Sequence, residues 1–212
     1  MNITFLRFTF LLMLAAGFFA LPAFGQGKIT ELSAPKAIVP AGGPRVALET
    51  TLGRIVVELY PEKAPQTVAN FLSYVRDGHY NGTVFHRVIA DMLIQAGAFT
   101  PDLQPKPGRS AIANEANNGL SNLRGTLSAA RRNSQTVSAT AQFFINTVDN
   151  RQLDYRGEAT PAMTGYCVFG RVLEGMEVVD RIRAVRTGPR PPFGADVPLS
   201  PVVIERALLV ED

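Results

Sequence analysis

The stretch FHRVIADMLIQAGAF, from Phe85 to Phe99, decides the fold and offers the first candidate site. Apolar residues on both sides of Ala90-Asp91 predict two short, half-buried strands. Because these two residues break the apolar pattern, we expect the second strand to fold back beside the first. Arg87 and Gln95 then face the same concave surface, where an arginine among apolar neighbours indicates a task beyond packing.

The segment AQFFIN, from Ala141 to Asn146, is a second β-prone run, with an amide beside two aromatic rings. Side chains on a strand alternate between its two faces. Gln142 and Phe144 are therefore predicted on one face, and Phe143 and Ile145 on the other. We expect one face to line a groove while the other fills the core.

The composition indicates one globular domain preceded by a leader. The chain has 212 residues, of which 46% are hydrophobic and 18% charged, and these values are typical of a folded domain. The net charge is +3, and removal of a leader that contains only Arg7 leaves +2. The densest basic run contains no aromatic residue for stacking on bases, so we expect no nucleic-acid partner. Its members are Arg181, Arg183, Arg186 and Arg190.

The sequence indicates neither a metal site nor a nucleophile. The single cysteine, Cys167, lies in the apolar run YCVF, where we expect a buried core residue. Two histidines, His79 and His86, are too few for an all-protein zinc site, and His86 is predicted to be a packed structural residue. Ser128 and Ser134 lack the GxSxG elbow of a hydrolase. We therefore expect no metal.

The N-terminus has the pattern of a secretory signal peptide over residues 1–25. Arg7 gives a weakly positive start, Phe8 to Ala20 is an apolar core, and Ala23-Phe24-Gly25 has the pattern of a cleavage site. The alternative is a membrane anchor, but the apolar run is shorter than the ~20 residues that a spanning helix needs. We therefore predict export, with no stable membrane insertion after cleavage. Residues 26–44 are predicted to be a flexible leader, and residues 45–212 the domain.

Within the domain, the patterns predict about eight strands and two helices. The first helix begins near Pro65 and ends before Gly78, and the second covers residues 174–184. Many short strands with two isolated helices favour an antiparallel barrel, although the pattern also allows a sandwich. The segment from Pro189 to Pro201 is predicted to be a Pro-rich loop. The predicted strands cover residues 46–50, 54–59, 126–129, 143–146, 168–172 and 202–209, and two more lie in 85–99.

The blocks FHRVI, MLIQAG, QFFIN and YCVFGRV occur in this order and together resemble the signature blocks of the cyclophilins, which are peptidyl-prolyl cis/trans isomerases. The resemblance runs from about Arg45 to the C-terminus. The run NEANNGLSNLRGTLSAAR, residues 114–131, is similar to the pattern of the bacterial periplasmic branch. The resemblance implies a mainly β domain, a closed eight-stranded antiparallel barrel capped by two helices. It also implies that the exported protein is periplasmic.

The resemblance further assigns roles to individual residues. It implies that Arg87 and Gln95 are catalytic, with Arg87 stabilising a twisted amide and Gln95 orienting Arg87. The expected partners are proline-containing polypeptides, bound by a monomer, and rotation of an amide needs no cofactor. The implied substrate-binding residues are Met92, Leu93 and Phe144 in the proline pocket, Leu153 and Tyr166 at its rim, Ala130 and Arg131 along the substrate backbone, and Gln142.

Three places depart from the family's usual pattern. The family usually has Pro-Gly-Phe-Met where this chain has residues 90–93, Ala-Asp-Met-Leu; Gln152 stands for a rim aromatic, and Ala141 for a serine. Met92 is a pliable filler, but the lost phenylalanine softens the cup. The enzyme therefore has an alternative, a non-catalytic proline-peptide-binding or chaperone module on the same fold. A purely structural envelope protein is disfavoured, because Arg87 and Gln95 lie together.

Overall fold

The computed structural model describes residues 42–131 and 137–210. The predicted signal peptide, and the predicted leader up to residue 41, lie outside these residues. The first strand begins at Arg45, where the family resemblance also begins.

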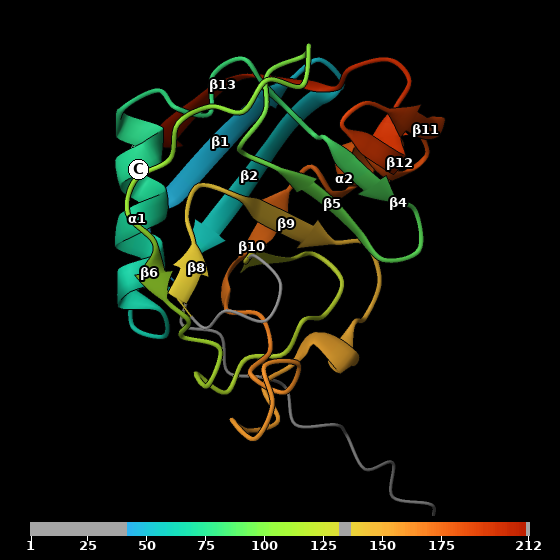
Figure 1. Cartoon of the computed structure of the whole chain (residues 1–212). Helices are drawn as coiled ribbons and strands as arrows, with labels where there is room; N and C mark the ends of the chain where they lie inside the picture. Colours follow the sequence, from blue (N-terminus) through green and yellow to red (C-terminus); the bar gives the residue numbers. More distant parts are fainter. Residues whose placement is uncertain (1–41, 132–136, 211–212) are drawn as a thin grey trace, which may run out of the picture. The chain divides into compact units, whose positions relative to one another are not determined.

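One antiparallel sheet of nine strands forms most of the domain (Figure 1). Its order is β3-β13-β1-β2-β10-β7-β9-β5-β4, so many neighbouring strands lie far apart in the sequence. Its members are β1 (Arg45–Thr50), β2 (Gly53–Leu59), β3 (Thr83–Val84), β4 (Arg87–Ile89), β5 (Leu93–Ala96), β7 (Thr126–Ala129), β9 (Phe143–Asn146), β10 (Val168–Glu174) and β13 (Val203–Val210).

The sheet contains the hairpin that the sequence predicts at the start of the domain. Strands β1 and β2 pair directly, and the hairpin closes at Thr50 opposite Gly53. Gly53 has φ +127°, a conformation that side chains rarely adopt. Leu48 and Ile55 lie opposite each other, and both are fully buried. The alternating sequence therefore sets the register of the first two strands.

Two helices pack against the sheet, as predicted. Helix α1 (Pro65–Arg76) contacts β13, and Gly78 follows it with φ +65°. Helix α2 (Met176–Arg183) contacts β2, β4 and β5. Gly175 precedes α2 with φ +89°, and a Cβ there would lie 2.3 Å from a backbone oxygen of Arg54. Among the described residues, no helix is long and apolar enough to cross a membrane.

Aromatic rings fill the core between α1 and the sheet. Phe71 of α1 packs edge to face on Phe143 of β9, with ring centroids 5.5 Å apart, and lies 5.3 Å from Phe169 of β10. Cys167 is buried in the same core, as predicted. Burial disfavours its thiolate and raises its pKa to about 12. Cys167 therefore serves as a packing residue of the core and not as a reactive thiol.

The number of strands differs from the prediction. The sheet has nine strands where eight were expected, because β3 is only two residues long and shows no alternation that a pattern could reveal. Its two end strands, β3 and β4, are separated in the chain by Phe85 and His86 alone. The sheet therefore curls until its ends approach each other. No pairing among the described residues joins β3 to β4, so the expected closed barrel is not confirmed.

Two small sheets lie outside the main one. Strand β6 (Ile112–Ala113) pairs with β8 (Val137–Ala139), and β11 (Thr187–Arg190) pairs with β12 (Phe193–Pro198). The prediction of a Pro-rich loop from Pro189 to Pro201 was therefore wrong. The sequence TGPRPPFGADVP shows no apolar alternation, and its prolines argue against a strand. The β11–β12 hairpin packs beside β4 (Figure 1).

Candidate active site

Arg87, Gln95 and Phe144 form a row across three neighbouring strands. Arg87 of β4 lies directly opposite Gln95 of β5, and Gln95 lies opposite Phe144 of β9. Directly opposed residues of antiparallel strands point to the same face of a sheet. The three side chains therefore share the outer face, and the prediction that Arg87 and Gln95 lie together is confirmed.

The adjacent row on the same strands points into the core. Val88 lies opposite Ile94, Ile94 opposite Ile145, and Ile145 opposite Leu127 of β7. All four side chains are buried in the main apolar core. A shift of one residue in register would exchange the two rows. The buried row therefore fixes the position of the outer row.

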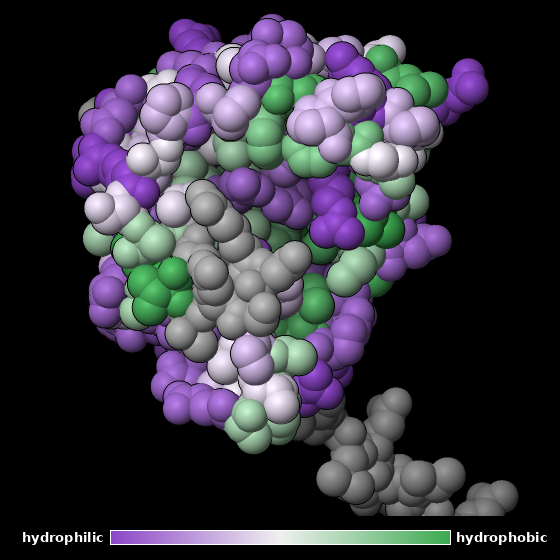
Figure 2. Space-filling view, viewed as in Figure 1, coloured by the Kyte–Doolittle hydropathy of each residue, from purple (hydrophilic) through white to green (hydrophobic). Residues whose placement is uncertain are grey.

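A hollow of about 290 Å³ opens on this outer face. Figure 2 shows that the surface over β4, β5 and β9 mixes hydrophilic and hydrophobic groups. The predicted inward direction of Phe143 and Ile145, and the outward direction of Gln142 and Phe144, are both confirmed. The hollow is lined by all ten residues that the sequence analysis singles out, namely Arg87, Met92, Leu93, Gln95, Ala130, Arg131, Gln142, Phe144, Leu153 and Tyr166.

Two polar side chains of the hollow are joined, and a third is open to a ligand. The Gln95 amide donates a hydrogen bond of 2.7 Å from Nε2 to Oε1 of Gln142. Gln95 is therefore held in one orientation by Gln142, with its own Oε1 left to accept. No hydrogen bond among the described residues joins Gln95 to Arg87, so the expectation that Gln95 orients Arg87 is not confirmed. Arg87 is 47% exposed, and its nearest charged partner, Asp196, lies 3.7 Å away. No described residue is hydrogen-bonded to its guanidinium, so Arg87 can donate into the hollow.

An apolar cup lies beside this polar pair and is separate from the main core. Leu93 and Phe144 form its floor together with Ala130, and these three residues are buried. Tyr166 meets Phe144 edge to face, with ring centroids 5.5 Å apart and an angle of 78°. Such a pair favours a fixed ring orientation. Met92 and Leu153 complete the cup.

Backbone groups and a second arginine form the opposite rim. The N–H of Ala130 donates to the backbone oxygen of Gln142 over 3.0 Å, which joins the two sides of the hollow. The Arg131 guanidinium lies 5.0 Å from the ring centroid of Tyr166 and donates to the backbone oxygen of Pro161 over 2.9 Å. A cation over an aromatic face is attracted by the ring. Arg131 therefore stiffens the rim of the cup.

His86 lines the hollow, and its imidazole is neutral at physiological pH. Its ring centroid is 4.7 Å from that of Phe99 and 5.7 Å from that of Phe193. Burial disfavours the charged imidazolium, and the neighbouring Arg87 adds to this, so the pKa falls to about 4. The predicted packed, structural role fits this environment. Ser128 is also buried, and its hydroxyl donates to Asn122 over 2.8 Å.

The positions that depart from the family pattern leave one side of the cup open. Gln152 is exposed and donates from Nε2 to Oδ1 of Asn150 over 3.0 Å, so its amide points along the loop. It does not line the hollow. Asn150 in turn donates to the backbone oxygen of Met92 over 2.7 Å. Met92 is thus held in place from the backbone, while its side chain stays half-buried.

One wall of the hollow was not predicted from the sequence. Phe193 of β12 lines it together with Phe99, and the two rings meet edge to face 5.0 Å apart. Asp196, on the same strand, approaches Arg87. The signal that could have found them is the FGADV run inside the Pro-rich segment, where an aromatic and a carboxylate interrupt the small residues.

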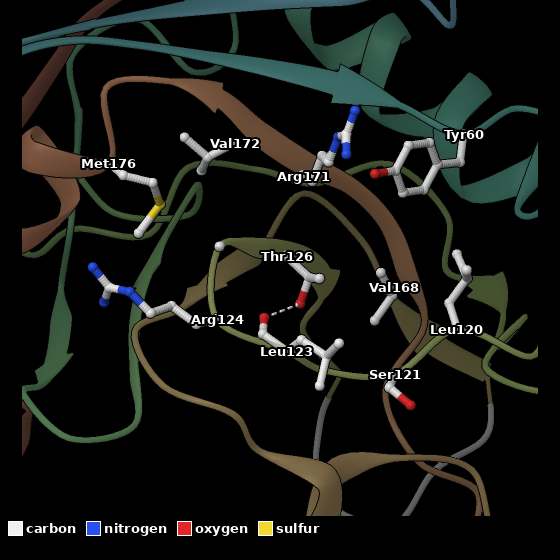
Figure 3. A pocket seen from close by; sticks show the side chains of 11 residues that line it. Tyr60, Leu120, Ser121, Leu123, Arg124, Thr126, Val168, Arg171, Val172 and Met176 are labelled. Carbon is white, nitrogen blue, oxygen red and sulfur yellow. Dashed lines mark hydrogen bonds between the residues drawn. The ribbon is translucent and has the colours of Figure 1, made fainter. Parts of the chain in front are cut away.

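A second hollow of about 360 Å³ lies between β7, β10 and the start of α2 (Figure 3). Its two guanidinium groups already have partners: Arg124 pairs with Asp180 over 2.7 Å, and Arg171 pairs with the buried Glu58 over 3.1 Å. Burial also raises the pKa of Tyr60 above its usual value. None of the ten predicted residues lines this hollow. Its charged groups therefore serve the fold, and the smaller hollow is the better candidate.

The fold and the smaller hollow define a class of protein in which a curled antiparallel sheet carries, on its outer face, an apolar cup beside an arginine. The family described as "Cyclophilin type peptidyl-prolyl cis-trans isomerase/CLD" matches residues 45–208. The chain therefore belongs to the cyclophilin-type peptidyl-prolyl cis-trans isomerases.

Relatives and solved structures agree with this family. The chain is 54% identical over 165 residues to peptidyl-prolyl cis-trans isomerase cyp18 of Streptomyces antibioticus, which covers 78% of this chain and 98% of the relative. It is 50% identical over 166 residues to peptidyl-prolyl cis-trans isomerase B of Escherichia coli, covering 78% and 99%. The crystal structure of a cyclophilin-type isomerase from Cryptosporidium parvum, obtained in the presence of the dipeptide Ala-Pro, superposes with a TM-score of 0.66. At 24% identity, covering 79% of this chain and 99% of the other, it supports the fold alone.

Proposed function

We propose that the hollow on the outer face is where this isomerase rotates X-Pro bonds, and that Arg87 is the principal catalytic residue. One observation carries the proposal. The side chains of Arg87, Gln95 and Phe144 lie in one row, and an apolar cup adjoins that row in the same hollow. A prolyl ring in the cup would bring its amide bond beside the guanidinium.

The reaction that the site would catalyse is rotation about a C–N bond with partial double-bond character. The barrier is ~18–20 kcal/mol because the amide nitrogen shares its lone pair with the carbonyl. At a twist of ninety degrees the sharing ends, and the nitrogen becomes pyramidal and basic. A donor aimed at that nitrogen, or at the carbonyl oxygen, interacts more strongly with the twisted amide than with the planar one. Arg87 is such a donor.

The required rate acceleration shows how much of the stabilisation Arg87 can supply. Uncatalysed exchange takes ~10–100 s, so a turnover near ~10³ s⁻¹ needs roughly 5.5–7 kcal/mol of differential stabilisation. One preorganised donor supplies about 3–4 kcal/mol. The remainder is assigned to the cup, which excludes water from the ring, and to Gln95, Gln142, Ala130 and Arg131, which hold the substrate backbone on either side.

We further propose that the protein acts as a monomer on proline-containing segments of exported proteins, in the periplasm. The support is the signal-like sequence of residues 1–25 and the similarity of residues 114–131 to the bacterial periplasmic branch. N-terminal sequencing of the protein recovered from cell fractions tests this proposal. The expected N-terminus is near Gln26, in the periplasmic fraction. A chain that still begins at Met1 and is recovered from the cytoplasm would contradict it.

The catalytic proposal is tested by Arg87→Ala in an assay of X-Pro isomerisation in a short peptide. We expect kcat/KM to fall by roughly 10²–10³-fold, the cost of one preorganised donor. The free energy of unfolding should change by less than ~0.5 kcal/mol, since the side chain is half exposed. Arg54 is a matched control, because it is also an exposed strand arginine in one ion pair, with Glu49 at 3.3 Å.

The outcomes separate the enzyme from the alternative. Arg54→Ala is expected to leave kcat/KM unchanged. A wild type that binds Pro-containing peptides but does not accelerate isomerisation would support the non-catalytic module, which Met92 and the open rim at Gln152 favour. An active wild type that is indifferent to Arg87→Ala would show that the hollow works by another mechanism.

A further inference from the structure

The β11–β12 hairpin brings a carboxylate to the candidate catalytic arginine. Oδ2 of Asp196 lies 3.7 Å from Nε of Arg87, and the two side chains are 39% and 47% exposed. The contact is on the Nε side of the guanidinium. No described residue is hydrogen-bonded to the two terminal amino groups, so they remain for a substrate.

The backbone of β12 is irregular at this carboxylate. Gly188 pairs with Val197 and Arg190 with Phe193, so one residue of β11 faces three residues of β12 between these pairs. Such bulges redirect side chains and are frequent beside active sites. Asp196 is the last residue of the bulge and has φ +63°. This left-handed conformation is uncommon outside glycine, although aspartate tolerates it better than most residues.

The hairpin is anchored on both sides of the bulge. Phe193 packs edge to face on Phe99, and Val197 is buried beneath. The Arg190 guanidinium donates to the backbone oxygens of Pro198 and Pro101, over 3.4 and 3.5 Å. The carboxylate of Asp196 is therefore presented from a packed wall of the hollow, and its strained backbone is held there by the contacts around it.

We propose that Asp196 is a positioning residue that holds the guanidinium plane of Arg87, so that the terminal amino groups meet the twisted prolyl amide. The inference rests on the proposed role of Arg87. A long, exposed arginine side chain samples many rotamers, and a carboxylate at Nε removes those that turn the fork away from the hollow. An exposed ion pair adds little to the stability of the fold. The effect of Asp196 is therefore expected in catalysis.

The carboxylate also acts in the opposite direction, because its negative charge lowers the positive potential at Arg87. Both groups are well exposed to water, where the high dielectric constant keeps this attenuation small. Orientation is sensitive to small displacements, since a 1 Å misplacement in an active site can cost about 10²-fold in rate. The orienting effect is therefore expected to exceed the electrostatic one, and removal of Asp196 should lower the activity.

The test measures kcat and KM for Asp196→Ala and Asp196→Gly on a short X-Pro peptide. We expect kcat/KM to fall by about 5- to 10-fold in both, a fraction of the full cost of misplacement, with KM nearly unchanged. Glycine suits φ +63°, so Asp196→Gly should keep or raise the melting temperature and still lose activity. Glu49→Ala, which breaks the ion pair with Arg54 outside the hollow, is the matched control and should leave kcat/KM unchanged.

A double-mutant cycle with Arg87→Ala decides whether Asp196 acts through the arginine. We expect Asp196→Ala to change nothing in the Arg87→Ala background. Wild-type kcat/KM in both Asp196 variants, with the large loss in Arg87→Ala intact, would overturn the positioning role and leave the proposed function standing. An equal loss in the Arg87→Ala background would also overturn it, since Asp196 would then act elsewhere. No loss in Arg87→Ala itself would overturn both proposals.

Discussion

Strands β4, β5 and β9 carry two adjacent rows of side chains with opposite requirements. The inner row, Val88, Ile94 and Ile145, is apolar and buried, and each member packs against the next strand. The outer row begins at the half-exposed Arg87 and continues through Gln95 to Phe144. The two rows lie on the same three strands. Burial of the inner row fixes the register, so the residue types of the outer row are not constrained by packing and can serve the reaction.

The two rows differ in the property that a substitution changes. A change in the inner row removes packing from a dense core, and the cost appears in the stability of the fold. A change in the outer row removes groups that face solvent or a substrate, and its cost appears mainly in activity. Phe144 is intermediate, because it lies in the outer row but is buried in the apolar cup. Its substitution should therefore affect both stability and activity. Substitutions in each row therefore test this difference.

The largest expected effect on stability comes from Ile145→Ala. Ile145 is fully buried between Ile94 and Leu127, so its truncation should lower the free energy of unfolding by about 2–5 kcal/mol. Chemical denaturation measures this loss. Under conditions where the variant remains folded, kcat/KM should stay within about twofold of wild type, because the outer row is not altered. If the variant kept wild-type stability but lost activity, the inner row would contribute to activity and not to stability, which contradicts this difference between the rows.

The next effect concerns His86, which lies buried beside Arg87. Its pKa is lowered from 6.5 to about 4 in the folded protein. Below pH 6.5 the unfolded chain binds a proton that the folded chain does not, so stability falls as the pH drops from about 6.5 to about 4. We expect His86→Asn to remove roughly 3 kcal/mol of this pH dependence. Denaturation curves at several pH values measure it.

His79 is present in both proteins of that experiment, so its own titration cancels in the difference. Equal pH slopes for the wild type and His86→Asn would show that His86 is not held neutral by burial. The same neutral state predicts that kcat/KM is flat between about pH 6 and 8, since amide rotation requires no proton transfer. A bell-shaped profile in that range would indicate an acid or base in the mechanism.

A smaller effect is expected for Gln95→Ala in the outer row. The substitution removes one neutral hydrogen bond to Gln142 and the contact with the substrate backbone that we propose for Gln95. A neutral hydrogen bond contributes about 1 kcal/mol, so kcat/KM should fall by about 10-fold or less. Gln104→Ala, an exposed glutamine outside the hollow, is the control. A loss as large as that of Arg87→Ala would show that Gln95 has a primary role.

The smallest expected effect is for Met92→Phe at the cup. The substitution supplies the ring that the family usually has at this position, so we expect kcat/KM to be held or raised by up to a few-fold. The peptide assay with several residues before the proline measures the change. A tenfold fall would show that the methionine is fitted to this chain's open rim, and that the cup differs from the family's proline pocket.

Part of the site could be predicted from the residues themselves, because it lies on strands with strong alternation. The FHRVI and QFFIN blocks determine which side chains point outward, and the structure places all ten predicted residues around one hollow. Their chemical roles stay proposals until they are measured. The row of inner apolar residues explains the placement of Arg87, Gln95 and Phe144, because burial on one face leaves no freedom in register. Residues such as Arg131, Leu153 and Tyr166 lie outside the strands and were implied by the resemblance to the cyclophilins.

The rest could not be predicted because its local sequence is weak. Strand β3 has two residues, and the β11–β12 hairpin is built from glycines and prolines that favour loops. Phe193 packs on Phe99 and His86, which are distant in the sequence. The left-handed backbone at Asp196 likewise depends on the contacts around the bulge. Tertiary contacts, rather than propensity, form this wall of the hollow.

We propose that the outer row presents a planar, oriented donor to the prolyl amide, and kcat/KM of Arg87→Lys is the decisive measurement. Lysine keeps the positive charge but lacks the fork and the Nε group that faces Asp196. We expect a value close to that of Arg87→Ala, about 10²-fold below wild type, with stability unchanged. Activity within a few-fold of wild type would contradict it, because a point charge alone would then suffice.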